Sequence, residues 1–184
     1  MIPTLPLRLR NRLAATILAA LHDTAARRAL ARLAVDGAGA WLEDDESRWA
    51  PPLAARARAA CAALADRPLL RPDAGMRETL AATAVLFDAG LYFEVHEALE
   101  SHWAAASGEA REALQGLIQI AVAWQHLANG NPAGARSLLV EGGARLHGRA
   151  LLGVDLEAFA RAAAEAAARL TAGLAITPPR FPPY

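Results

Sequence analysis

Apolar side chains recur every three or four residues through most of this 184-residue chain, which is the spacing of one face of an α-helix. In the first such stretch, Leu9, Leu13 and Ile17 would share a face. Ala occupies 48 positions and residues that favour strands are scarce, so good helix formers dominate. We therefore predict an all-α protein, folded as a single compact helical bundle of about six to seven helices.

Glycine, proline and capping residues mark where the helices end and begin. The acidic run at 43–46 is expected to form a solvated loop, and two prolines make 67–75 the clearest linker. We divide the chain into an N-terminal helical extension packed on the same core (1–75), a signature helical bundle (76–175) and a proline-rich tail (176–184). The expected helices cover about residues 7–33, as one long or two short helices, 51–65, 76–89, 91–105, 107–129, 131–147 and 155–171.

The charge balance and the cysteine count exclude several classes of protein. Nineteen arginines balance nineteen acidic residues and there is no lysine, so no net positive charge is available for binding nucleic acid. No apolar run approaches the roughly 18–20 residues that span a bilayer, so we expect a cytoplasmic protein without a membrane partner. The single cysteine, Cys61, excludes an intrachain disulfide and a cysteine-based zinc site. Homo-oligomerisation is left open.

Aromatic and ionisable residues concentrate between residues 87 and 126, a stretch that holds half of the ten aromatic side chains. At about 100° per residue, His96, Glu100 and Trp103 fall on one narrow stripe of their helix. Glu97 lies to one side of that stripe, about 60° from Glu100. These residues are the strongest local sign of a functional site.

The next expected helix carries a matching polar stripe formed by Gln115, Gln119 and His126. This helix is otherwise apolar almost all round, which indicates deep burial. A buried amide without a partner costs about 1–3 kcal/mol, so the glutamines need polar partners. Consecutive helices with a short connection usually pack antiparallel, so we expect the two stripes to meet in a buried polar network.

One interpretation of the cluster is a divalent metal site. The pattern His96-Glu97-x-x-Glu100 is a variant of the His-Glu-x-x-His zinc motif in which a carboxylate replaces the second imidazole. The ligands would be His96 and Glu100, with His126 as the best candidate for a third. Such a site would support hydrolytic chemistry, with Glu97 or Glu100 as the general base and His96 as a ligand or acid–base group.

Two other interpretations remain open. The cluster can form a pocket for a small molecule, in which Trp103, Tyr92 and Phe93 supply the apolar walls and His96 and Glu100 the polar contacts, with Gln115 and Gln119 as further binding residues. Alternatively, the network is purely structural and fixes the register of the helices. In that case the chain is a non-catalytic scaffold or a protein-interaction module. The sequence therefore leaves open whether the protein is an enzyme.

The same residues carry a family likeness. The segment His-Glu-x-x-Glu-x-x-Trp at 96–103 is followed by Gln-Gly-Leu-Ile-Gln at 115–119 and by a Gly-Asn pair at 130–131. This order of motifs resembles the domain of unknown function 309 family over about 60 residues. Asp88 stands where the family more often has Asn. The resemblance implies a compact all-helical fold and no particular activity, and it singles out His96, Glu97, Glu100, Trp103, Gln115 and Gln119.

Overall fold

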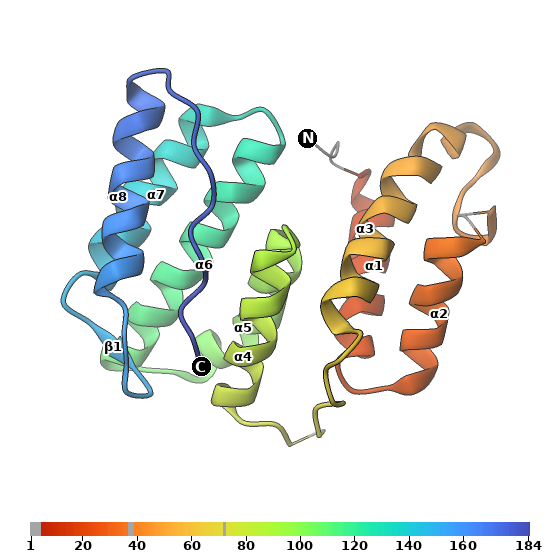
Figure 1. The fold of residues 1–184 in the computed structure, drawn as a ribbon, viewed down its shortest axis with the longest axis horizontal. Coiled ribbons are helices and arrows are strands. Elements are labelled where there is room, and N and C mark those ends of the chain that lie inside the picture. Colours follow the sequence, from red (N-terminus) through yellow and green to blue (C-terminus); the bar gives the residue numbers. More distant parts are fainter. Residues whose placement is uncertain (1–4, 37–38, 72) are drawn as a thin grey trace.

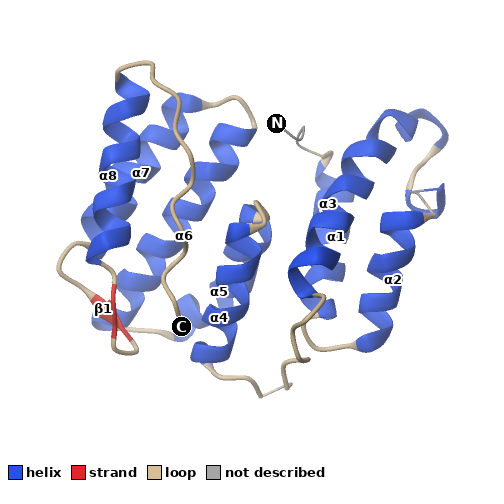
Figure 2. Cartoon of the chain, in the orientation of Figure 1, coloured by secondary structure: helices blue, strands red, loops and turns tan. Residues whose placement is uncertain are grey.

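The structure is a computed structural model that describes residues 5–36, 39–71 and 73–184 (Figure 1). Within these ranges the chain forms eight α-helices, two 3₁₀ helices and one two-stranded antiparallel sheet, which confirms the all-α prediction (Figure 2). No helix in these ranges is long and apolar enough to span a membrane. The elements in chain order are α1 (Leu7–Ala20), α2 (Thr24–Val35), η1 (Gly39–Trp41), η2 (Asp44–Trp49), α3 (Ala50–Leu64), α4 (Met76–Asp88), α5 (Tyr92–Ala105), α6 (Gly108–Ala128), α7 (Pro132–Leu146), β1 (Ala150–Leu151), β2 (Val154–Asp155) and α8 (Glu157–Thr171).

The helices form two groups that lie side by side, α1 to α3 and α4 to α8 (Figure 1). They share one hydrophobic core, because α1 packs against α5 as well as against α2 and α3, and α3 also contacts α4. Leu9, Leu13 and Ile17 of α1 are fully buried, as their spacing predicts. The first group therefore covers one side of α5, the helix that carries the candidate site.

The stretch predicted as one long or two short helices is two helices, α1 and α2. The carboxylate of Asp23 accepts hydrogen bonds from the backbone N–H groups of Ala25 and Ala26, at 2.9 and 3.1 Å. These bonds satisfy donors that have no partner inside the first turn of a helix. Asp23 therefore starts α2, and the chain turns there instead of continuing α1.

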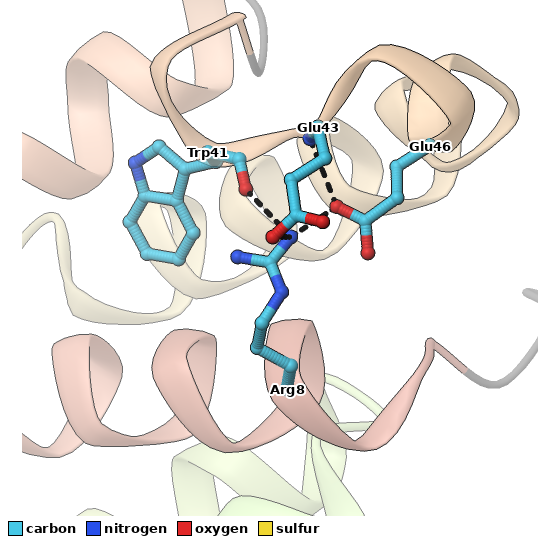
Figure 3. Close-up of polar contacts among 4 residues, drawn as sticks. All are labelled: Arg8, Trp41, Glu43 and Glu46. Atoms are coloured by element: carbon cyan, nitrogen blue, oxygen red, sulfur yellow. Dashed lines mark hydrogen bonds and ion pairs between the residues drawn. The ribbon is translucent and has the colours of Figure 1, made fainter.

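The acidic run predicted as a solvated loop instead leads into the 3₁₀ helix η2. The Glu43 backbone N–H donates to the Glu46 carboxylate at 3.0 Å. Arg8 of α1 forms an ion pair with Glu46, lies 3.6 Å from Glu43 and donates to the Trp41 carbonyl at 3.4 Å (Figure 3). Arg8 compensates part of the negative charge of the run, of which Glu43, Asp44 and Asp45 remain exposed to solvent, as predicted.

Helices α6 and α7 cross at very short range because glycines lie at the crossing. A Cβ added at Gly142 would lie 2.8 Å from Ile120 Cγ1 and 3.0 Å from the Gly116 carbonyl oxygen. Real Cβ atoms do not approach backbone oxygens this closely without displacement. The small residues at this point therefore set the separation of the two helices.

The proline-rich tail runs back over the bundle and packs on it (Figure 1). The Phe181 ring is buried and lies 5.3 Å from the Phe87 ring and 5.6 Å from the Phe159 ring, measured between centroids. Asp88 accepts a hydrogen bond from the Phe181 backbone N–H at 3.3 Å and pairs with Arg180 at 2.8 Å. Asp88 thus holds the tail.

We expect Gly142→Ala to lower the free energy of unfolding by about 1–2 kcal/mol, because overpacking at the crossing outweighs the helix propensity that alanine adds. Urea unfolding followed by circular dichroism measures the change. Gly39→Ala is the control, since a Cβ there meets nothing within 4 Å. A Gly142→Ala protein as stable as the wild type would contradict the close crossing.

We expect Phe181→Ala to lower the free energy of unfolding by about 2–4 kcal/mol, because it removes a buried ring from the aromatic cluster. Arg180→Ala should have little effect, because the Arg180 side chain is 89% exposed and water screens its ion pair. Thermal unfolding of both variants checks this difference. Equal losses in the two variants would mean that the ion pair holds the tail as strongly as the buried ring, which would contradict this expectation.

Candidate metal centre

Helix α5 brings His96, Glu97 and Glu100 together at its surface. Each residue offers one ligand atom, and these atoms all lie within 4.8 Å of one another. His96 Nδ1 is 3.1 Å from Glu97 Oε1, and the two side chains are 31% and 34% exposed, whereas Glu100 is exposed. The cluster is therefore reachable from solvent.

The position of the cluster follows from the way α5 begins and packs. Gly90, with φ +76°, ends α4 in a left-handed turn, and Leu91 then donates its backbone N–H to the Leu86 carbonyl at 2.9 Å. The buried face of α5 includes Val95 and Leu99. His96 and Glu100 each follow one of these residues by one position, about 100° around the helix. They consequently lie beside the buried face and not within it.

The predicted buried network between α5 and α6 is not formed among the described residues. Gln119 donates instead to Glu141 of α7 at 3.0 Å, and His126 Nδ1 accepts a hydrogen bond from the Asn131 side chain at 2.9 Å. Gln115 is half-buried and has no hydrogen bond to the cluster. The reason is that α6 is packed between α5 and α7, so its polar stripe meets α7 and the following turn.

The prediction of His126 as a metal ligand is accordingly wrong. His126 lies in the last turn of α6, where it binds Asn131 of the following turn, and is not part of the group of converging ligand atoms. Glu97, predicted as a general base and not as a ligand, is the third member of that group. Glu100 was expected in the interior and is exposed.

The three aromatic residues predicted as pocket walls have packing partners of their own, and the Phe93 ring lies 4.2 Å from the Arg10 guanidinium. The Arg111 guanidinium lies 4.0 Å above the Trp103 ring and donates to the Trp103 carbonyl at 2.8 Å, which closes the corner between α5 and α6. The Tyr92 ring packs edge-on against Phe87 at 5.1 Å. Burial raises the pKa of the Tyr92 hydroxyl, and the charge of Asp88 adds to this effect.

A buried carboxyl group beside the cluster was missed by the sequence analysis. Glu94 is 1% exposed and Arg56 of α3 is 6% exposed. Burial raises the pKa of Glu94, and the nearby Arg56 guanidinium acts in the opposite direction. Glu94 lies in the first turn of α5, where an acidic residue is ordinarily explained by the helix dipole, so nothing in the sequence marked it as buried.

A cavity of about 350 Å³ adjoins the cluster, and Glu97 belongs to both. Its other polar wall residues are His22, Thr79, Ser101 and His102. His102 is half-buried, with Nε2 3.0 Å from Thr79 Oγ1. His22 lies in the turn after α1 and Thr79 lies in α4, so these wall residues of the cavity come together only in the tertiary fold.

The protein is all-helical, and one helix of its bundle carries a solvent-accessible cluster of one histidine and two glutamates beside a cavity. Residues 80–138 match the model of a protein family described as "Domain of unknown function (DUF309)". This match confirms the resemblance predicted from the sequence. It covers about a third of the chain and includes all three cluster residues, whereas α1 to α3 and α8 lie outside it. No curated protein and no solved structure matches the chain.

Because the pKa of Glu94 is raised in the folded protein, the free energy of unfolding should depend on pH through this residue. The folded protein holds this proton to a higher pH than the unfolded chain does, so the contribution of Glu94 to stability falls as pH rises above the unfolded value of about 4.5. Glu94→Gln removes that contribution. We therefore expect the free energy of unfolding of Glu94→Gln to decrease less between about pH 4 and pH 8 than that of the wild type.

Urea unfolding at a series of pH values measures this slope, with Glu165→Gln as the control because Glu165 is exposed on α8. The control should keep the wild-type slope. If Glu94→Gln also kept it, Glu94 would not titrate differently in the folded and unfolded states.

Proposed function

We propose that the protein binds a divalent transition-metal ion through His96 and Glu100, with Glu97 beside it. The observation that carries the proposal is the convergence of three ligand atoms within 4.8 Å on a solvent-accessible face of α5. Ligands of a zinc ion lie about 2.0–2.2 Å from it, which places neighbouring ligand atoms about 3–3.5 Å apart. Small side-chain rotations are enough to reach that spacing.

The donor set suits such an ion. Imidazole and carboxylate groups together favour zinc and related divalent metals, and residues four apart on a helix can hold one ion between them. His96 and Glu100 have this spacing. The contact between His96 Nδ1 and Glu97 would open on binding, because a coordinating imidazole nitrogen must give up its proton.

The activity that we propose is metal-assisted hydrolysis. In the His-Glu-x-x-His motif the glutamate directly after the first ligand is the general base, and Glu97 occupies that place here. Glu97 also lines the cavity, so its carboxylate can take a proton from a water molecule that attacks a substrate held there. A divalent ion with open coordination positions would lower the pKa of a bound water molecule and polarise the bond to be cleaved.

Isothermal titration of the untagged, chelator-treated protein with Zn²⁺ tests the proposal. We expect saturable binding of one ion per chain, weakened about tenfold or more by His96→Ala and by Glu100→Gln. Glu97→Gln should weaken binding much less, because we assign Glu97 to proton transfer. The matched control is His147→Ala, since His147 pairs with Glu157 elsewhere in the molecule.

Two results would contradict the proposal. The first is the absence of saturable Zn²⁺ binding. The second is binding that His96→Ala and Glu100→Gln leave unchanged. Either result would favour the structural interpretation, in which the cluster is part of a non-catalytic scaffold.

A further inference from the structure

The cavity beside Glu97 lies where the end of α1, the segment before α4 and the middle of α5 meet. Its volume of about 350 Å³ falls within the range of small-molecule sites. One part of the wall is apolar and comes from Leu18, Leu21 and Leu70. The polar part contains two imidazoles, one carboxylate and two hydroxyl groups, and their hydrogen bonds decide what the cavity can bind.

The imidazole of His22 presents a free acceptor. Its Nδ1 lies 3.2 Å from the carbonyl oxygen of Arg71, and a carbonyl only accepts. Nδ1 therefore carries the proton, and Nε2 of the neutral ring keeps its lone pair. Among the described residues, Nε2 has no hydrogen-bond partner.

The imidazole of His102 also keeps a free acceptor nitrogen, because its other ring nitrogen donates to the Thr79 hydroxyl. The Thr79 hydroxyl donates its proton to the Gly75 carbonyl at 3.2 Å, so Thr79 Oγ1 accepts from His102 Nε2 at 3.0 Å. Nε2 thus carries the proton of the ring, and Nδ1 keeps its lone pair. In the part of the chain that the structure describes, this Nδ1 also has no hydrogen-bond partner.

The polar wall of the cavity consequently offers two acceptor nitrogens, one carboxylate and the Ser101 hydroxyl, which can donate or accept. Besides the two imidazole lone pairs it contains the Glu97 carboxylate, and no arginine side chain is among its described wall residues. These acceptors do not converge on one point: within the described ranges, only His96, Glu97 and Glu100 form a group of ligand atoms closer than 4.8 Å. A single ion cannot reach the dispersed acceptors, whereas an organic molecule with several N–H groups can.

We propose that this cavity binds a small organic cation, an aliphatic amine or guanidinium compound. Its N–H groups donate to Glu97, His22 and His102, and its alkyl chain packs on the three leucines of the apolar wall. The cavity thereby selects positively charged, donor-rich molecules against carboxylates of the same length. This inference does not depend on a bound metal ion, since its ligand atoms other than Glu97 lie outside the proposed metal centre.

Titration of the full chain with butylguanidinium, followed by isothermal calorimetry in metal-free buffer, tests the inference. Butyrate is the matched probe of opposite charge. We expect saturable binding of butylguanidinium that is at least about tenfold tighter than any binding of butyrate. His22→Phe and His102→Phe should each weaken it about fivefold, the effect of one lost hydrogen bond.

Ala74→Trp places a large ring in the cavity from the segment before α4 and leaves α5 unaltered. It should abolish butylguanidinium binding while Zn²⁺ binding persists, which separates this inference from the metal proposal. His147→Phe lies outside the cavity and should bind like the wild type. Butyrate binding as tight as that of butylguanidinium, or unchanged binding in the His22→Phe, His102→Phe double variant, would overturn the inference.

Discussion

The packing of α5 determines where every residue of the candidate site lies. This helix contacts α4, α6 and α1, and its buried face includes Val95 and Leu99. A helix turns by about 100° at each residue, so the side chain after a buried one emerges at the edge of the interface. His96 and Glu100 occupy that edge, where their ligand atoms lie within 4.8 Å of each other and Glu100 is exposed to solvent.

Much of the fold could be predicted from the sequence, because apolar spacing and capping residues act locally. The face of α1 and the break at Gly90 are examples. The likeness to the family was also evident in local motifs. The ion pair between Arg8 and the acidic run could not be predicted, since it joins residues far apart in the chain.

The site was predicted in part. The spacing of His96 and Glu100 on a single helix predicted a shared stripe with Glu97 to one side, and the ligand atoms of these three residues lie within 4.8 Å of one another. The contacts of the polar residues on α6 were predicted wrongly, because antiparallel packing of two helices does not determine how each helix is rotated about its own axis. Gln119 and His126 face α7 and the following turn for that reason. The cavity residues His22, in the turn after α1, and Thr79, in α4, are far apart in the sequence, and no local pattern connects them.

The N-terminal helices lie outside the segment that matches the family, yet they complete the surroundings of the site. They supply His22 and Leu18 to the cavity, and Arg56 to the neighbourhood of the buried Glu94. A crystal structure of the Zn²⁺-soaked protein, with anomalous diffraction recorded at the zinc edge, tests the central claim most directly. We expect an anomalous peak between His96 and Glu100. A peak only at the His147–Glu157 pair, or no peak at all, would contradict it.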